Sequence, residues 1–144
     1  MDAPQPLAVE RAASDQMMHI WPHVKEYFAS FEARTGGEFT AGDLLLACIE
    51  RRMQCWVATD GDQVKACALT EVLTNDFGTV IISFCAGKDR KEWQDQIVDT
   101  ISQWARDLGS KRVRAIHRPG WDRFLKTKGF KRNHFISDME LDNA

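Results

Sequence analysis

A short loop between a buried strand and a long helix carries the residues best placed for chemistry in this chain. The loop, residues 86–91, contains Gly87 and three basic side chains. Where the carboxyl end of a strand leads into a helix N-terminus, backbone N–H groups and the helix dipole can hold an anion. Asp89 and Glu92, however, have the three-residue spacing with which a helix start satisfies its own N–H groups. We expect this helix start to be capped by its own carboxylates, with anion binding as the alternative.

No other spacing in the sequence marks a nucleophile or a metal site. The chain has no GxSxG, P-loop or HExxH motif. Its four cysteines stand singly, with no CxxC pair and no Cys/His ligand spacing. We therefore expect small buried thiols in a reducing compartment, with neither disulfides nor a metal. The cysteines are Cys48, Cys55, Cys67 and Cys85.

The helix after this loop has one continuous apolar stripe. Its members recur at a period of about 3.6 residues, which is typical of an amphipathic helix. They are Trp93, Ile97, Ile101, Trp104 and Leu108. Gly109 ends the helix, and a β-rich run over residues 112–116 follows at once. A strand, a helix and a second strand with short joints predict a βαβ crossover with two parallel strands.

Two helices are predicted in the N-terminal third, after a short strand over residues 6–12. Ser14 is the expected N-cap of the first helix, and Pro22 is expected to interrupt that helix and to begin a fresh turn. The second helix is expected to begin with a capping box at Thr40, in which Asp43 replaces the usual Glu or Gln.

The rest of the chain is expected to be rich in strands. Two apolar runs, residues 54–59 and 63–73, are joined by Asp60-Gly61-Asp62, a strong hairpin signal, and the buried strand of the crossover extends them into an antiparallel meander. A short helix over residues 121–128 and a final strand over residues 130–141 complete the prediction. The order is β-α-α-β-β-β-α-β-α-β. The fold class is α+β, with a single mixed, mainly antiparallel sheet and flanking helices.

Length and charge indicate one ordinary globular domain. With 144 residues, 44% of them hydrophobic, the chain is expected to form a single domain over residues 1–144, with residues 1–6 as a loose lead-in. A net charge of −2 gives no electrostatic reason to bind nucleic acid or an anionic membrane. No signal peptide and no apolar run near the ~20 residues of a membrane span are present, so we expect a cytoplasmic protein.

This order of elements resembles, over nearly the whole chain, the fold of the GNAT (Gcn5-related N-acetyltransferase) superfamily. Two local features add to the resemblance. The strand that ends in Cys85-Ala86-Gly87 turns into a long helix as the family's acyl-CoA loop does, and residues 121–130 are similar to the family's short fourth helix, which ends in Gly-Phe. Three shorter segments look like small GNAT-like proteins encoded in tailed-phage genomes. These segments are residues 56–58, 86–93 and 118–121.

The chain departs from the family pattern in the acyl-CoA loop and at the position of the catalytic acid. The family's loop has the pattern Gln/Arg-x-x-Gly-x-Gly/Ala, whose glycines let backbone N–H groups approach the cofactor pyrophosphate; the loop here has one glycine, Gly87. Many members have a tyrosine four residues before the glycine of Gly-Phe, where it protonates the leaving thiolate. The matching residue here is Leu125, which cannot transfer a proton, and the one tyrosine is Tyr27. The family's frequent Asn after the fifth strand is absent from residues 117–120.

For a working enzyme, the resemblance implies a site at the carboxyl ends of the two parallel strands. His117 is then the best candidate for proton transfer, with a surface histidine as the alternative. Glu71 is a candidate base, with a solvated carboxylate at a strand end as the alternative. The cofactor would be acetyl-CoA, and no other cofactor or metal is implied. The residues implied to bind it are Cys85, Ala86, Gly87, Lys88, Asp89 and Arg90. As a nucleophile, Cys85 has no support, and a buried structural thiol is expected.

Three hypotheses about function follow. The first, which we favour, is a GNAT-fold protein that has lost standard acetyl transfer and serves as a phage accessory or virion component, with phage structural proteins among its expected partners. The second is an acetyl-CoA-dependent N-acetyltransferase acting on a protein or small-molecule amine through positioning and an oxyanion-binding amide. The third is a sensor that binds acyl-CoA without turnover. Free backbone amides between the parallel strands favour the enzyme, whereas Trp93, Trp121 or Arg118 filling that gap argues against it.

Overall fold

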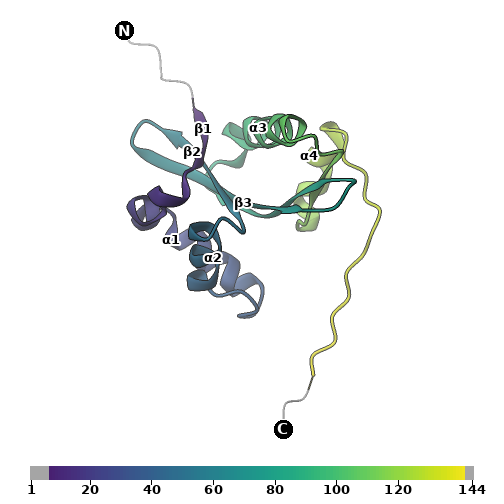
Figure 1. Cartoon of the computed structure of the whole chain (residues 1–144), viewed down its shortest axis with the longest axis horizontal. Helices are drawn as coiled ribbons and strands as arrows, with labels where there is room; N and C mark the ends of the chain where they lie inside the picture. The colour runs from purple at the N-terminus through teal and green to yellow at the C-terminus, as the bar shows by residue number, and fades with distance from the viewer. Residues whose placement is uncertain (1–6, 142–144) are drawn as a thin grey trace.

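A five-stranded mixed sheet runs through the middle of the molecule in the computed structural model, which describes residues 7–141 (Figure 1). The strands follow one another across the sheet in the order β1-β2-β3-β4-β5; neighbours are antiparallel except β4 and β5, which are parallel. The predicted α+β fold class is confirmed, while the predicted lead-in at residues 1–6 lies outside the described residues. The strands are β1 (Ala8–Ala12), β2 (Gln54–Asp60), β3 (Gln63–Leu73), β4 (Thr79–Gly87) and β5 (Arg112–Ala115).

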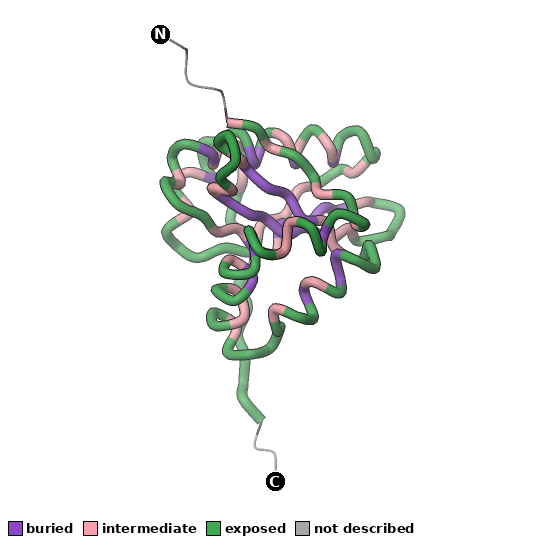
Figure 2. Tube along the Cα trace, turned by 90° about the vertical axis from the view of Figure 1, so that its left-hand side faces the viewer, coloured by how far each residue is buried: buried purple, intermediate pink, exposed green. Residues whose placement is uncertain are grey.

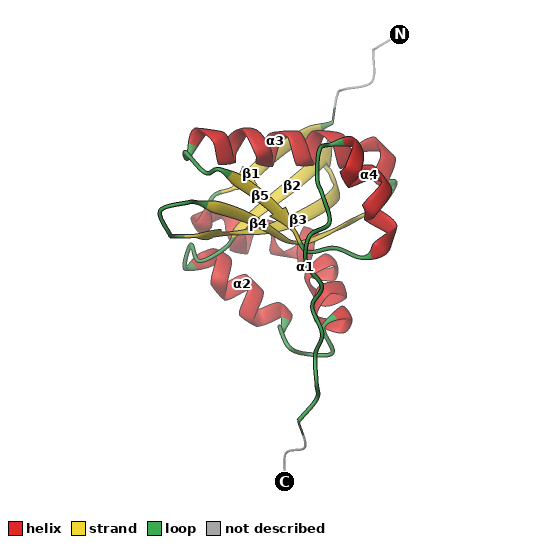
Figure 3. Ribbon diagram, turned by 90° about the vertical axis from the view of Figure 1, so that its right-hand side faces the viewer, coloured by secondary structure: helices red, strands yellow, loops and turns green. Residues whose placement is uncertain are grey.

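Helices cover both faces of this sheet (Figure 3). The helices α1 (Met17–Arg34) and α2 (Ala41–Ile49) lie on one face, and α3 (Gln94–Asp107) and α4 (Asp122–Thr127) on the other. Each face has its own apolar cluster, and the buried residues follow the central strands (Figure 2). Phe28 and Phe84 belong to the first cluster, Trp93 and Ile101 to the second. Burying one such side chain contributes about 1.5–3 kcal/mol, so both helical layers are firmly attached to the sheet.

The crossover β4-α3-β5 forms as predicted, and its two strands are parallel. The helical stripe is confirmed at its first three members: Trp93, Ile97 and Ile101 are each no more than 1% exposed. Leu108 lies beyond the end of α3 and is 52% exposed, because the helix stops one residue before it.

Two local predictions for the first half of the chain are confirmed, the capping box of α2 and the β2-β3 hairpin turn. Thr40 accepts a hydrogen bond from the backbone N–H of Asp43 at 3.0 Å, and the carboxylate of Asp43 accepts one from the N–H of Thr40, so the capping box is complete. The β2-β3 hairpin turns at Gly61, whose φ of 60° lies in the left-handed region that glycine adopts without strain.

The prediction for the first helix is wrong in detail. Ser14 opens a short 3₁₀ turn instead of capping α1, and Pro22 lies inside a continuous α1. Pro22 is the sixth residue of that helix, so its missing N–H removes one hydrogen bond close to the N-terminus. The helix tolerates this loss because Val24 and Phe28, both 0% exposed, pack it onto the sheet.

The predicted final strand is also wrong. Residues 130–141 have no regular secondary structure and no ladder partner, and β5 remains the edge of the sheet. A strand is stabilised by pairing with its neighbour, and alternation of apolar residues alone does not provide that pairing.

Candidate functional site

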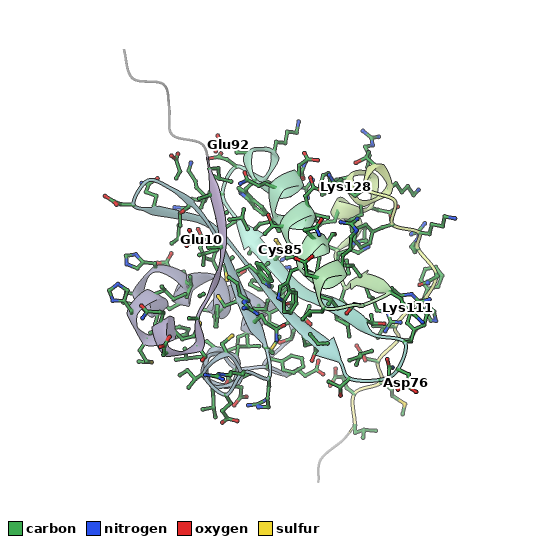
Figure 4. The ribbon with its side chains drawn as sticks, turned by 45° about the horizontal axis from the view of Figure 1, so that its top comes forward. Glu10, Asp76, Cys85, Glu92, Lys111 and Lys128 are labelled. Atoms are coloured by element: carbon green, nitrogen blue, oxygen red, sulfur yellow. The ribbon has the colours of Figure 1, made fainter. Side chains whose placement is uncertain are left out.

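The strands β4 and β5 are hydrogen-bonded to each other along only part of β4. Their pairing ends at Ile82, opposite Ala115, whereas β4 continues to Gly87. A bulge at Ser83 bends β4 at this point, because the residues on either side of Ser83 pair with consecutive residues of β3. Beyond Ile82 the two strands are therefore no longer joined, and we call the place where they part, near Cys85 (Figure 4), the gap between β4 and β5.

Lys65 of β3 holds the loop that follows β4. Its ammonium lies 3.3 Å from a carboxylate oxygen of Asp89 and 3.6 Å from one of Glu92. The carbonyl of Lys65 accepts a hydrogen bond from the N–H of Lys88 at 2.9 Å. The hydrogen bond to Asp89, followed by the charge of Glu92, raises the pKa of Lys65. The predicted capping by these two carboxylates is wrong, because the full charge of Lys65 attracts them more strongly than the partial charge of a helix end.

The close contact of residue 87 with β3 explains why a glycine stands at this position. A Cβ placed on Gly87 would lie 2.6 Å from the Cβ of Ala66 and 2.7 Å from its Cα, and would collide with the carbonyl of Lys65. Real Cβ contacts are not this short, so only glycine lets the two strands approach here. Atoms of Lys65 and Ala66 occupy the space where a side chain of residue 87 would lie, so the glycine leaves no room for a ligand on this side of the loop.

Trp93 is buried directly before the first residue of α3. It is 1% exposed, and its indole N–H donates to the carbonyl of Lys88 at 2.6 Å. A 3₁₀ turn, η2 (Arg90–Glu92), connects the loop to the helix, and within it the N–H groups of Glu92 and Trp93 donate to backbone carbonyls. These bonds satisfy the last two N–H groups before α3 within the loop itself.

Arg90 and Trp121 bridge the gap between the ends of β4 and β5. The guanidinium of Arg90 lies 4.6 Å from the ring centroid of Trp121 and donates to the carbonyl of Gly120 at 3.3 Å. The ring of Trp121 lies 6.0 Å from that of Trp93 and packs against the cluster on the α3 face. Side chains from both strand ends therefore meet across the gap.

The two candidate catalytic residues do not meet. His117 is exposed just beyond β5, with Nδ1 2.8 Å from the carbonyl of Arg118. Glu71 is half-buried on β3 and accepts a hydrogen bond from the hydroxyl of Ser83 at 3.1 Å. Within residues 7–141 no hydrogen bond joins His117 to Glu71, so the structure does not assemble them into one acid–base pair.

Cys85 is a protonated thiol. Burial raises its pKa to about 12, although the nearby positive charges of Arg34 and Arg90 oppose this shift. Arg34 is a residue that the sequence analysis missed: it reaches β4 from the end of α1, with its guanidinium 5.0 Å from the ring centroid of Phe84. Burial, and then the charge of Arg118, lower the pKa of Arg34. No local motif signals this arrangement, because the contributing elements are far apart in the chain.

Neither Leu125 nor Tyr27 supplies an acid at the gap. Leu125 is 4% exposed and is apolar. The hydroxyl of Tyr27 donates to the carbonyl of Val64 at 3.0 Å, and burial raises the pKa of this phenol. The described part of the chain also contains no group of His, Cys, Asp or Glu side chains that could hold a metal ion. None of its helices combines the length and apolar character needed to cross a bilayer.

Comparison with solved structures identifies the fold. An aminoglycoside acetyltransferase from an uncultured soil metagenomic sample matches with a TM-score of 0.72 at 11% identity, over 96% of this chain and 100% of that one. The aminoglycoside N-acetyltransferase AAC(6')-Iy, solved in complex with CoA, matches with a TM-score of 0.68 at 9% identity, over 97% of both chains. A predicted acetyltransferase from Clostridium acetobutylicum, solved with acetyl-CoA, matches with a TM-score of 0.68 at 9% identity, over 93% of this chain and 96% of that one.

This chain therefore has the GNAT fold of acetyltransferases. No protein-family model and no curated protein sequence matches the chain. At these identities the similarity establishes the fold alone.

Proposed function

We propose that this chain is a GNAT-fold protein that has lost standard acetyl transfer and acts through contacts with other proteins. The bridge from Arg90 to Gly120 and Trp121 carries this proposal. It lies where β4 and β5 separate, which is where the resemblance implies an acyl-CoA cofactor. The guanidinium lies over the indole and donates to a carbonyl, and a ligand at this position would have to displace both contacts.

The loop itself fits acetyl-CoA poorly. Its only glycine packs against β3, and two carboxylates, those of Asp89 and Glu92, stand where the pyrophosphate would need positive charge. Lys65 partly neutralises these carboxylates but is itself occupied by them. The residues of this loop therefore do not fit the pyrophosphate of acetyl-CoA.

The expected partner is another protein. The resemblance of residues 86–93 and 118–121 to small phage GNAT-like proteins supports a role as a phage accessory or virion component, acting in the cytoplasm of the host or in the particle. This role stays a prediction, since the similar structures described above are acetyltransferases.

The alternative is an acetyl-CoA-dependent N-acetyltransferase. Two observations favour it: β4 and β5 do separate after Ile82, and two similar structures were solved with CoA or acetyl-CoA. In that case His117 and Arg90 would border the cofactor, and positioning would supply most of the catalysis. Similarity to aminoglycoside acetyltransferases makes aminoglycosides the first acceptors to try.

The two functions are separated by measuring CoA release from acetyl-CoA over a panel of amines that includes aminoglycosides and basic peptides. The proposal predicts release no faster than without protein for every amine. Turnover that falls at least about tenfold in a folded His117→Ala variant would overturn it, because removing a positioned proton-transfer group costs about that much or more.

A further inference from the structure

The outer edge of β5 is open, and an extended segment of the chain runs past it without pairing. Residues 130–136 and 110–117 both line one hollow of ≈ 880 Å³. In Figure 4 this segment descends from the region of Lys128, past Lys111 and toward Asp76, so it runs antiparallel to β5. An unpaired strand edge is a template for another strand, and this one has a candidate beside it.

The segment exposes apolar side chains to an unusual degree. Phe135 is 86% exposed, Ile136 74%, Met139 80% and Leu141 74%. Ile116, just beyond β5, is 49% exposed. A cluster of exposed apolar residues at one edge is typical of an interaction site.

Charges along β5 and along the segment are complementary. Val113 and Ala115 pack toward α3, so Arg112 and Arg114 point to the opposite face of the sheet. In an extended segment, Asp138 and Glu140 share one face while Phe135, Met139 and Leu141 share the other. Among residues 7–141, none of the two arginines and two carboxylates has an ion-pair partner.

One antiparallel register pairs both arginines with both carboxylates. It places Arg112 opposite Glu140 and Arg114 opposite Asp138, and it also places Val113 opposite Met139 and Ile116 opposite Ile136. A slip by one residue would move Asp138 and Glu140 to the face on which Val113 and Ala115 pack toward α3, so the charges favour this register.

We propose that residues 135–141 of one copy add as a sixth strand to β5 of a second copy, and that the exchange is reciprocal. The chain's own edge is not closed by its own segment, which passes it across the hollow. Twelve extended residues span up to about 40 Å, enough to reach a neighbouring copy. A two-fold pair of copies offers the same edge and the same segment twice. This proposal does not depend on whether acetyl-CoA binds.

Two charge-reversed variants test the exchange by light scattering and sedimentation. The edge variant carries Arg112→Glu and Arg114→Asp, and the segment variant carries Asp138→Arg and Glu140→Arg. Each variant alone places like charges opposite each other, so its dimer should dissociate at least about tenfold more readily than the wild type. In an equimolar mixture, both edges meet segments of opposite charge, and a heterodimer should form again. An own-chain contact cannot be restored by mixing.

The matched control is Asp60→Arg with Asp62→Arg, which makes the same charge change at the β2-β3 hairpin and should leave the dimer intact. Circular dichroism confirms that each variant is folded. A monomeric wild type, a dimer that both variants keep, or a mixture that stays monomeric would each overturn the proposal. A monomer whose amides at residues 135–141 resist hydrogen exchange would assign the strand to the chain's own edge, and would overturn it as well.

Discussion

Arg90 donates a hydrogen bond to the carbonyl of Gly120 at 3.3 Å and thereby joins the loop after β4 to the turn after β5. These two segments are 30 residues apart in sequence and meet only because the parallel strands place their carboxyl ends side by side. The same contact lies across the gap that opens when the strands separate. The chain therefore has the fold of acetyltransferases, but Arg90 and Trp121 occupy the gap between β4 and β5.

Trp121 should be important for stability. It is half-buried and contacts Arg90, Trp93 and the ring of Phe124, at a centroid distance of 6.1 Å. Trp121→Ala should lower the free energy of unfolding by about 2–4 kcal/mol, somewhat less than for a fully buried tryptophan. Urea denaturation followed by circular dichroism measures this loss. A loss below about 0.5 kcal/mol would mean that the indole does not fill the gap, since that is the size of an ordinary surface effect.

Gly87 and Gly120 form a matched pair. Gly87→Ala should lower the free energy of unfolding by about 2 kcal/mol or more, because the new Cβ cannot fit against β3. Gly120→Ala meets no atom within 4 Å and should change stability by less than about 1 kcal/mol. Thermal unfolding of the two variants tests the difference. Equal stabilities would contradict the close approach of Gly87 to β3, and Gly87 would then be available to a ligand.

The raised pKa values of two thiols predict that the protein loses stability at alkaline pH. Burial raises the pKa of both Cys48 and Cys85 from an ordinary value of 9.0 to about 12. Below pH 9 both thiols are mainly protonated in the folded and in the unfolded chain, so they do not change the free energy of unfolding there. Between pH 9 and 12 only the unfolded chain ionises, and stability should fall by at most about 1.4 kcal/mol per pH unit for each thiol.

Unfolding in urea at pH 8, 9 and 10 measures this slope. The Cys48→Ala variant should show a shallower fall than the wild type over the same range, after allowance for its lower starting stability. Identical slopes would show that the thiol of Cys48 titrates normally in the folded protein.

A variant at Leu125 tests whether a tyrosine at the family's acid position is enough to give acetyl transfer. Leu125→Tyr places a phenol at the family's acid position, yet the site is 4% exposed and already filled. We expect a loss of about 1–3 kcal/mol in the free energy of unfolding and no gain in CoA release. Leu125→Phe is the matched control, because it adds the ring without the hydroxyl. Turnover in the Tyr variant alone would show that only the acid is missing.

The fold was largely predictable because its signals are local. The stripe from Trp93 to Ile101, the capping box at Thr40 and the turn at Gly61 depend on residues close together in sequence, and all three are confirmed. The final strand over residues 130–141 failed because pairing requires a distant partner.

The site was less predictable, since its contacts join distant segments. The spacing of Asp89 and Glu92 indicated capping, but Lys65, more than twenty residues away in the chain, binds both carboxylates. Arg34 reaches Phe84 from another layer of the fold. The gap was expected to be either open or filled by Trp93, Trp121 or Arg118; Trp121 does take part, but its partner Arg90 was assigned to the cofactor.

Titration of the wild-type protein with acetyl-CoA by calorimetry tests the central claim most directly. Arg90→Ala serves as the comparison, since it removes the bridge to Gly120 and Trp121 while leaving the fold elsewhere intact. We predict no saturable heat for the wild type up to millimolar acetyl-CoA. Saturable binding at micromolar acetyl-CoA, weakened in Arg90→Ala, would contradict the account and would make Arg90 a ligand of the cofactor instead of a bridge across its site.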